Sequence, residues 1–138
     1  MSANNNAIFV GTFQGKVTEL SDTTETDIFV GDAVEGTRLD ALCVSTDDTA
    51  DKDLIVRVYD GTASKTLTTI KIPLTSGTTN AIVPVNLLAH AQMAAFVGTD
   101  SAGNKYLNLP PTWKIRAAMA AAPTAGKKMW VFARGGKY

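Results

Sequence analysis

The chain has 138 residues, of which 45% are hydrophobic and 19% charged, and its formal net charge at pH 7 is zero. This length suits one domain with a buried core, and the composition is that of a globular rather than a disordered chain. No apolar run approaches the ~20 residues that a membrane-spanning helix needs, and residues 1–6 lack the basic start and apolar stretch of a secretory signal. Cys43 is the only cysteine, which excludes an intrachain disulfide and favours synthesis in a reducing cytoplasm; we expect its side chain to be buried.

The charges are distributed unevenly along the chain. Residues 1–60 contain twelve acidic and four basic side chains, whereas residues 101–138 contain seven basic and no acidic ones. In the simpler interpretation, the two halves interleave in one sheet and neutralise each other across strands. The alternative is that the asymmetry marks an interaction surface.

The N-terminal part combines a polar segment with short apolar patches. Residues 4–6 are three asparagines, which we expect to form a flexible arm, and residues 8–10 are apolar. Residues 21–26 are rich in Ser, Thr and acids and predict a loop, because these side chains compete for backbone hydrogen bonds. Apolar segments rich in strand formers follow at 27–30 and 38–44.

The middle of the chain contains the clearest hairpin pattern. Residues 54–59 and 65–72 are rich in β-formers with a two-residue period, and an Asp-Gly pair at 60–61 begins the connection between them. A short apolar segment at 81–83 follows. Residues 86–96 then predict a short helix that begins at Asn86 and covers an edge or end of the sheet. Its expected apolar stripe consists of Leu87, Leu88, Ala91 and Ala95.

The C-terminal part returns to strand patterns. Alternation predicts strands at 106–109, 113–119 and 129–134, and Gly135-Gly136 predicts the end of the last one. Seven to nine short strands with frequent turn signals indicate a mainly β protein, an antiparallel β-sandwich or jelly-roll-like domain with one short helix. We assign residues 27–138 to the sandwich and residues 1–26 to an N-terminal arm with the first strand or strands, within a single domain overall.

The residues that could carry chemistry are few. His90 is the only histidine, with no cysteine pair to complete a metal site, and no serine lies in a Gly-x-Ser-x-Gly motif, so we expect a solvated or capping histidine. The acids at 47, 48, 51 and 53 form the densest cluster, but it lacks the central Gly and terminal Glu of a calcium loop. We interpret it as a charged surface turn, with an adventitious cation site as the alternative. The sequence therefore predicts no catalytic, cofactor-binding or metal-binding residues, and no enzyme.

A basic C-terminal third with Trp113, Trp130 and Tyr138 contains the ingredients of a single-strand nucleic-acid platform. Alternation, however, places Trp113 on the face opposite to Lys114 and Arg116. Trp130 shares a face with the residue at 134, but it is an isolated case. This arrangement argues against nucleic-acid binding.

The order of segments along the chain resembles a known group of proteins. The segments are DIFV (27–30), GTRLDALCVSTDDTA (36–50), DLIVRVYDG (53–61), NLL (86–88), GNKYLNLP (103–110), TAGKKMWV (124–131) and GGKY (135–138). In this pattern the chain resembles structural proteins of tailed-bacteriophage virions, of the capsid decoration or cement type. The resemblance implies a β-sandwich or jelly roll, often trimeric, that binds the capsid exterior at junctions between major capsid proteins and has no catalytic residues.

From this resemblance we expect a virion structural protein, synthesised in the host bacterial cytoplasm, that stabilises the capsid surface as a symmetric homo-oligomer, with a trimer favoured. The major capsid protein is the expected partner, and neither a membrane nor a cofactor is expected. Two alternatives stay open. One is another virion part, such as a neck, tail or fibre-head protein, and the other is a standalone carbohydrate- or nucleic-acid-binding β module.

Overall fold

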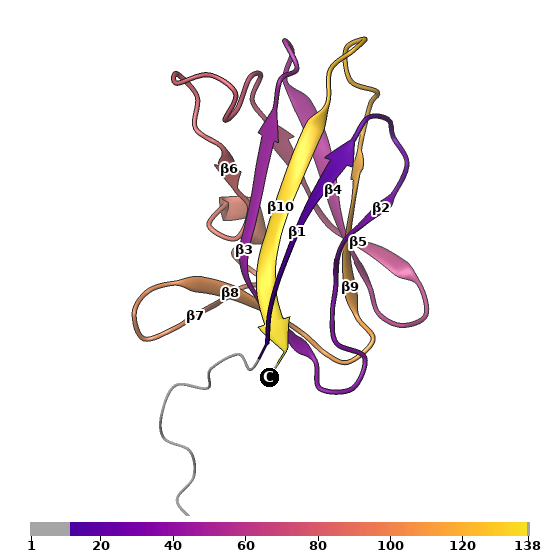
Figure 1. The fold of residues 1–138 in the computed structure, drawn as a ribbon, viewed down its shortest axis with the longest axis vertical. Coiled ribbons are helices and arrows are strands. Elements are labelled where there is room, and N and C mark those ends of the chain that lie inside the picture. Colours follow the sequence, from indigo (N-terminus) through magenta and orange to yellow (C-terminus); the bar gives the residue numbers. More distant parts are fainter. Residues whose placement is uncertain (1–11, 138) are drawn as a thin grey trace, which may run out of the picture.

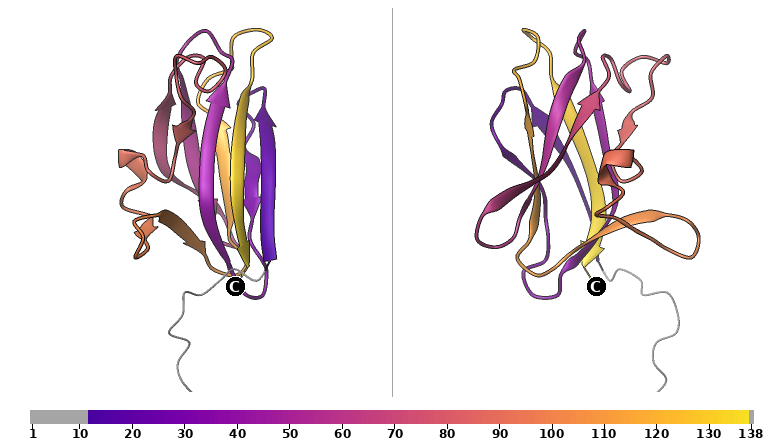
Figure 2. Two further views of the ribbon diagram at one scale, coloured as in Figure 1. Left: turned by 60° about the vertical axis from the view of Figure 1, so that its left-hand side comes forward. Right: turned by 180° about the vertical axis from the view of Figure 1, so that it is seen from behind.

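The computed structural model describes residues 12–137, which form two antiparallel β-sheets facing each other as two layers (Figures 1 and 2). The six-stranded sheet has the order β1-β10-β3-β8-β7, and β6 also pairs with β3. Its strands are β1 (Thr12–Leu20), β3 (Thr37–Thr46), β6 (Val85–Asn86), β7 (Gly98–Thr99), β8 (Lys105–Leu109) and β10 (Met129–Lys137). The four-stranded sheet has the order β2-β9-β4-β5, with β2 (Thr26–Val30), β4 (Lys52–Tyr59), β5 (Ser64–Ile72) and β9 (Lys114–Met119).

This architecture confirms the predicted mainly β, sandwich-like class. The core lies between the two layers, where alternate side chains of each strand point inward. Leu42 and Val44 from β3, Val131 from β10, and Leu54 and Ile70 from the other sheet are all buried. The predicted arm at 4–6, the apolar residues 8–10 and Tyr138 lie outside the described residues.

The predicted hairpin at 54–59 and 65–72 is confirmed as β4 and β5, which pair in antiparallel register from Lys52 opposite Ile72 to Tyr59 opposite Ser64. Asp60 organises the connection, because its Oδ1 accepts the backbone N–H groups of Thr62 and Ala63, each at 3.0 Å. The Ala63 N–H, then the Lys65 ammonium and the Thr62 N–H, favour the ionised carboxylate and lower the pKa of Asp60 to about 2.

The predicted helix at 86–96 is wrong in extent. Only a 3-10 helix at Ala91–Met93 forms, and Asn86 belongs to β6 instead of capping a helix. The Leu87 N–H donates to the Leu42 carbonyl at 2.8 Å, so residues 85–87 are held against β3 as an extended strand and no helix begins at Asn86. Ala91 and Ala95, which we expected on the buried stripe, are exposed. Tertiary pairing therefore overrides the local helix propensity of this segment.

The C-terminal strand also differs from the prediction, because Gly135 and Gly136 continue β10 instead of ending it. They lie opposite Leu39 and Arg38 of β3, just beyond a bulge between Arg134 and Gly135. A Cβ atom at Gly135 would overlap the carbonyl oxygen of Arg38 and approach the Leu39 Cα to 2.9 Å. Glycine is used here because the two backbones approach too closely for a side chain.

Gly135→Ala should therefore destabilise the protein by about 1–3 kcal/mol, since the new methyl group forces the two central strands apart. The matched control is Gly15→Ala on β1, where an added Cβ meets only the Ala133 carbonyl, at 3.9 Å. That variant should change the free energy of unfolding by no more than about 0.5 kcal/mol. Urea denaturation followed by circular dichroism measures both, and equal stabilities would contradict the close-approach argument.

Candidate functional site

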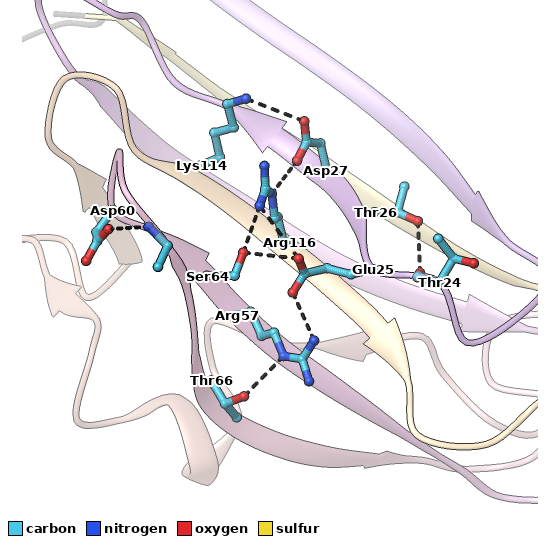
Figure 3. A network of polar contacts seen from close by, with 11 residues as sticks. Thr24, Glu25, Thr26, Asp27, Arg57, Asp60, Ser64, Thr66, Lys114 and Arg116 are labelled. Carbon is cyan, nitrogen blue, oxygen red and sulfur yellow. Dashed lines mark hydrogen bonds and ion pairs between the residues drawn. The ribbon is translucent and has the colours of Figure 1, made fainter.

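The outer face of the four-stranded sheet carries a network of charged side chains (Figure 3). Strand register places Asp27 opposite Arg116, and Arg116 opposite Arg57. Arg116 Nε contacts Asp27 Oδ1 at 2.6 Å, and the Lys114 ammonium lies 3.7 Å from the other oxygen of that carboxylate. The network thus links β2 to β9 through opposite charges.

Glu25 extends the network to β4 and β5. Its carboxylate contacts Arg57 at 2.9 Å and Arg116 at 3.6 Å, and it accepts the Ser64 hydroxyl at 3.1 Å. The hydrogen bond from Arg57 lowers the pKa of Glu25 most, against an opposing effect of desolvation. The Arg116 guanidinium also lies 4.3 Å from the ring centre of Tyr59. These groups bind one another across all four strands, so we interpret them as a structural brace for the sheet.

The pairs that Lys114 and Arg116 make with Asp27 and Glu25 join the acidic N-terminal half to the basic C-terminal third. Lys128 and Glu19, at 3.3 Å, do the same on the six-stranded sheet. Such pairs bear out the simpler interpretation of the charge asymmetry, in which the two parts interleave within each sheet. Of the arginines, Arg38, Arg57 and Arg116 are half-buried and ion-paired, whereas Arg134 is exposed.

The acidic cluster at 47–53 is only partly the surface turn that we expected. Asp48 is fully buried, and its carboxylate accepts the backbone N–H and hydroxyl of Thr124 at 2.9 and 2.7 Å. It also accepts the Ala50 N–H at 3.0 Å. Burial raises the pKa of Asp48, but the bonds from Thr124 and Ala50 outweigh it and leave the pKa below its usual value.

Two other acids of the cluster also hold loops in place. Asp47 accepts the Lys128 N–H at 2.8 Å, and Asp51 accepts the Leu74 N–H at 2.9 Å. Within residues 12–137, no group of three or more His, Cys, Asp or Glu side chains is arranged to hold a metal ion. The cluster therefore works as a set of backbone caps that joins three loops at one end of the sandwich.

His90 has the capping role that we expected, although at a 3-10 helix. Its Nδ1 accepts the Gln92 N–H at 3.1 Å, and the residue is half-buried. The described part of the chain contains no helix long and apolar enough to span a membrane.

The two tryptophans lie in different sheets. Trp113 precedes β9, is half-buried against the core, and lines an apolar groove of about 180 Å³ with Phe96 and Leu67. Trp130 lies on β10, where its indole N–H donates to Glu19 Oε1 at 3.3 Å. The two rings therefore form no common stacking platform, and the acid beside Trp130 disfavours a nucleic-acid backbone there.

The outer face of the six-stranded sheet carries the clearest candidate binding surface. One cross-strand row contains Val17, Phe132 and Cys43, from β1, β10 and β3. Figure 1 shows these three strands side by side in the front layer. Val17 is 63% and Phe132 40% exposed, and Cys43 is half-exposed, not buried as we predicted. Together with the half-exposed Trp130 we call these residues the outer patch.

Polar side chains surround the outer patch. Glu19 on β1 holds both Trp130 and Lys128, and Arg134 follows Phe132 on the same face of β10. An apolar centre with a charged rim is the usual arrangement of a protein-binding surface. The sequence does contain a signal for the outer patch. Residues 129–133 of β10 are apolar on both faces of the strand, whereas a strand with one solvent-exposed face needs apolar residues only on the other.

No protein-family model matches the chain, and no curated protein sequence matches it. The assignment of a function therefore depends on the outer patch and on the sequence resemblance alone.

Asp48→Asn should destabilise the protein by about 1–3 kcal/mol at pH 7, because an amide cannot accept all three bonds that the carboxylate accepts. Because the pKa of Asp48 lies below the usual 3.8 in the folded protein, its ionised form stabilises the fold above about pH 4. This stabilisation is lost as the pH falls through the lowered pKa, so the variant and the natural protein should converge there. Denaturation curves at a series of pH values from 7 downwards, to the lowest pH at which the protein folds, test this, with the exposed Asp53→Asn as control; a pH-independent difference would contradict it.

Proposed function

We propose that this protein is a virion structural protein of a tailed bacteriophage that decorates and stabilises the capsid exterior. It binds junctions between major capsid proteins as a symmetric oligomer, with a trimer as the favoured form. The outer patch is the observation that carries the proposal, because an apolar row exposed on a rigid sheet favours contact with another protein. The resemblance of the sequence to decoration proteins supplies the class of partner.

The physical properties of the fold suit this role. The outer patch lies on β1, β10 and β3, whose long antiparallel pairing holds its side chains in fixed positions. A rigid patch loses little conformational entropy on binding. When symmetry repeats the patch around an axis, several weak contacts act together and bind far more tightly than one.

A position elsewhere in the virion is the alternative that the same patch favours. A neck, tail or fibre-head protein also needs a rigid sandwich with one adhesive face. Immunogold labelling of intact particles separates the two, because decoration places the protein over the capsid and the alternative places it at the tail or its junction. A gene outside any phage or prophage would overturn both versions.

Phe132→Asp should weaken binding to purified capsid shells by about tenfold or more, since it places a charge at the centre of the outer patch. The matched control is Phe96→Asp, because Phe96 is also 40% exposed but lines the groove beside Trp113. Co-sedimentation with shells that lack the protein measures both, and melting temperatures confirm folding. If both variants bind as the natural protein does, the outer patch is not the contact.

A further inference from the structure

A hollow of about 410 Å³ opens next to the outer patch. Strand β8 pairs with residues 37–39 of β3, and β6 pairs with residues 43–44. The hollow lies between these two partners, at the level of the bulge where β10 shifts its register against β3. Side chains that line it include Asp40, Asn86, Leu88, Asn104, Lys105 and Arg134.

The hollow and the charged side chains beside it carry a net positive charge. The one acid that lines the hollow, Asp40, pairs with Arg38, whose Nε lies 2.8 Å from the carboxylate. With Asp100 included, the three cations Arg38, Lys105 and Arg134 outnumber the two carboxylates by one. Arg38 is fixed further by Asp100 at 3.3 Å and by the ring of Tyr106, 4.4 Å from its guanidinium. Lys105 and Arg134 are both exposed, so they supply cationic groups for a carboxylate from outside.

A segment with the complementary character lies in the same chain. The connection between β2 and β3, residues 32–35, presents Val34 with acids at both ends; we call it the acidic loop. Val34 is 81% exposed, the largest fraction among the exposed large hydrophobic residues of the described chain. Glu35 beside it is exposed as well.

The acidic loop is held in one shape. Asp32 Oδ1 accepts the N–H groups of Val34 at 2.9 Å and of Glu35 at 2.8 Å, and the Asp32 N–H donates to the Thr37 hydroxyl at 2.7 Å. The hydrogen bond from Glu35, then that from Val34, keeps the pKa of Asp32 below its usual value. With the two carboxylates of Asp32 and Glu35, the loop is acidic. A preorganised loop loses little entropy when it binds.

We propose that the acidic loop of one copy inserts into the hollow of a second copy, with Val34 packed against the exposed Ala89 at its edge and Glu35 paired with Arg134. The loop projects from the lower end of the sandwich, whereas the β7–β8 hairpin that borders the hollow projects sideways (Figures 1 and 2). Because β2 and β3 fix both ends of the loop, it cannot swing into the hollow of its own chain. The contact therefore joins two copies. It is head-to-tail, so it closes a ring where the rotation allows. The contact rests on the oligomeric part of the proposed function and is independent of the capsid.

The test measures the native mass of the full chain by sedimentation velocity over a range of concentrations. The natural protein should form an oligomer whose association weakens at high salt, because the contact pairs exposed charges. Arg134→Glu and Glu35→Lys should each weaken association about 100-fold, since each places like charges together. The double variant Arg134→Glu, Glu35→Lys should restore association, because the pair is reversed rather than removed.

Lys71→Glu is the matched control, because Lys71 is exposed on β5 of the other sheet and should leave association unchanged. Circular dichroism verifies the fold of every variant. A strictly monomeric natural protein, or an oligomer that neither single variant weakens, overturns the proposed contact. Shell binding is measured separately with the Glu35→Lys monomer, because Glu35 lies outside the outer patch. Loss of self-association with residual binding to shells supports both proposals, whereas a protein that associates with itself but never binds shells overturns the capsid role alone.

Discussion

The close approach of β10 to β3 is the constraint on which the rest of the structure depends. Gly135 brings the backbone of β10 against Arg38 and Leu39, and the register shifts at this point. Above the shift, β3 and β10 pair continuously and place Phe132 beside Cys43. On its other edge, β3 pairs with β8 before this point and with β6 after it, and the hollow lies between these two partners. A single glycine contact therefore separates an apolar surface from a cationic one on the same sheet.

The two outer faces of the sandwich differ in whether their side chains find partners within the chain. On the four-stranded sheet, Arg57 and Arg116 share Glu25, so the charges neutralise each other within the chain. Ion pairs at a protein surface contribute only about 0.2–1 kcal/mol each, and the main effect of these half-buried pairs is to leave little charge available for a partner. On the six-stranded sheet, Val17 and Phe132 have no such compensation. The six-stranded sheet is therefore the face whose exposed apolar side chains could be buried by a partner.

The sequence predicts those features that depend on neighbouring residues. The β4–β5 hairpin follows from alternation and from the Asp60-Gly61 turn, both local. The helix prediction for residues 86–96 is wrong for the opposite reason. The Leu42 carbonyl that accepts the Leu87 N–H lies far away in sequence. Asp48 shows the same limit. Its acidic neighbours in sequence predict an exposed turn, whereas the side chain is buried and bonded to Thr124, which is distant in sequence. For the outer patch the sequence signal is limited to the apolar residues 129–133, because Val17, Cys43 and Phe132 become neighbours only through strand pairing.

The positions of the hollow and the outer patch make the two proposed contacts, self-association and capsid binding, compatible with each other. Arg134 borders the hollow and follows Phe132 on one face of β10, so a copy docked at Arg134 lies beside the outer patch. Val17 is on β1, on the other side of β10 from the hollow. In the proposed self-association, contacts between Glu35 and Arg134 order neighbouring copies while the β1 side of each patch stays open. A ring built in this way presents several such patches at once, and multivalent binding then needs only modest affinity from each.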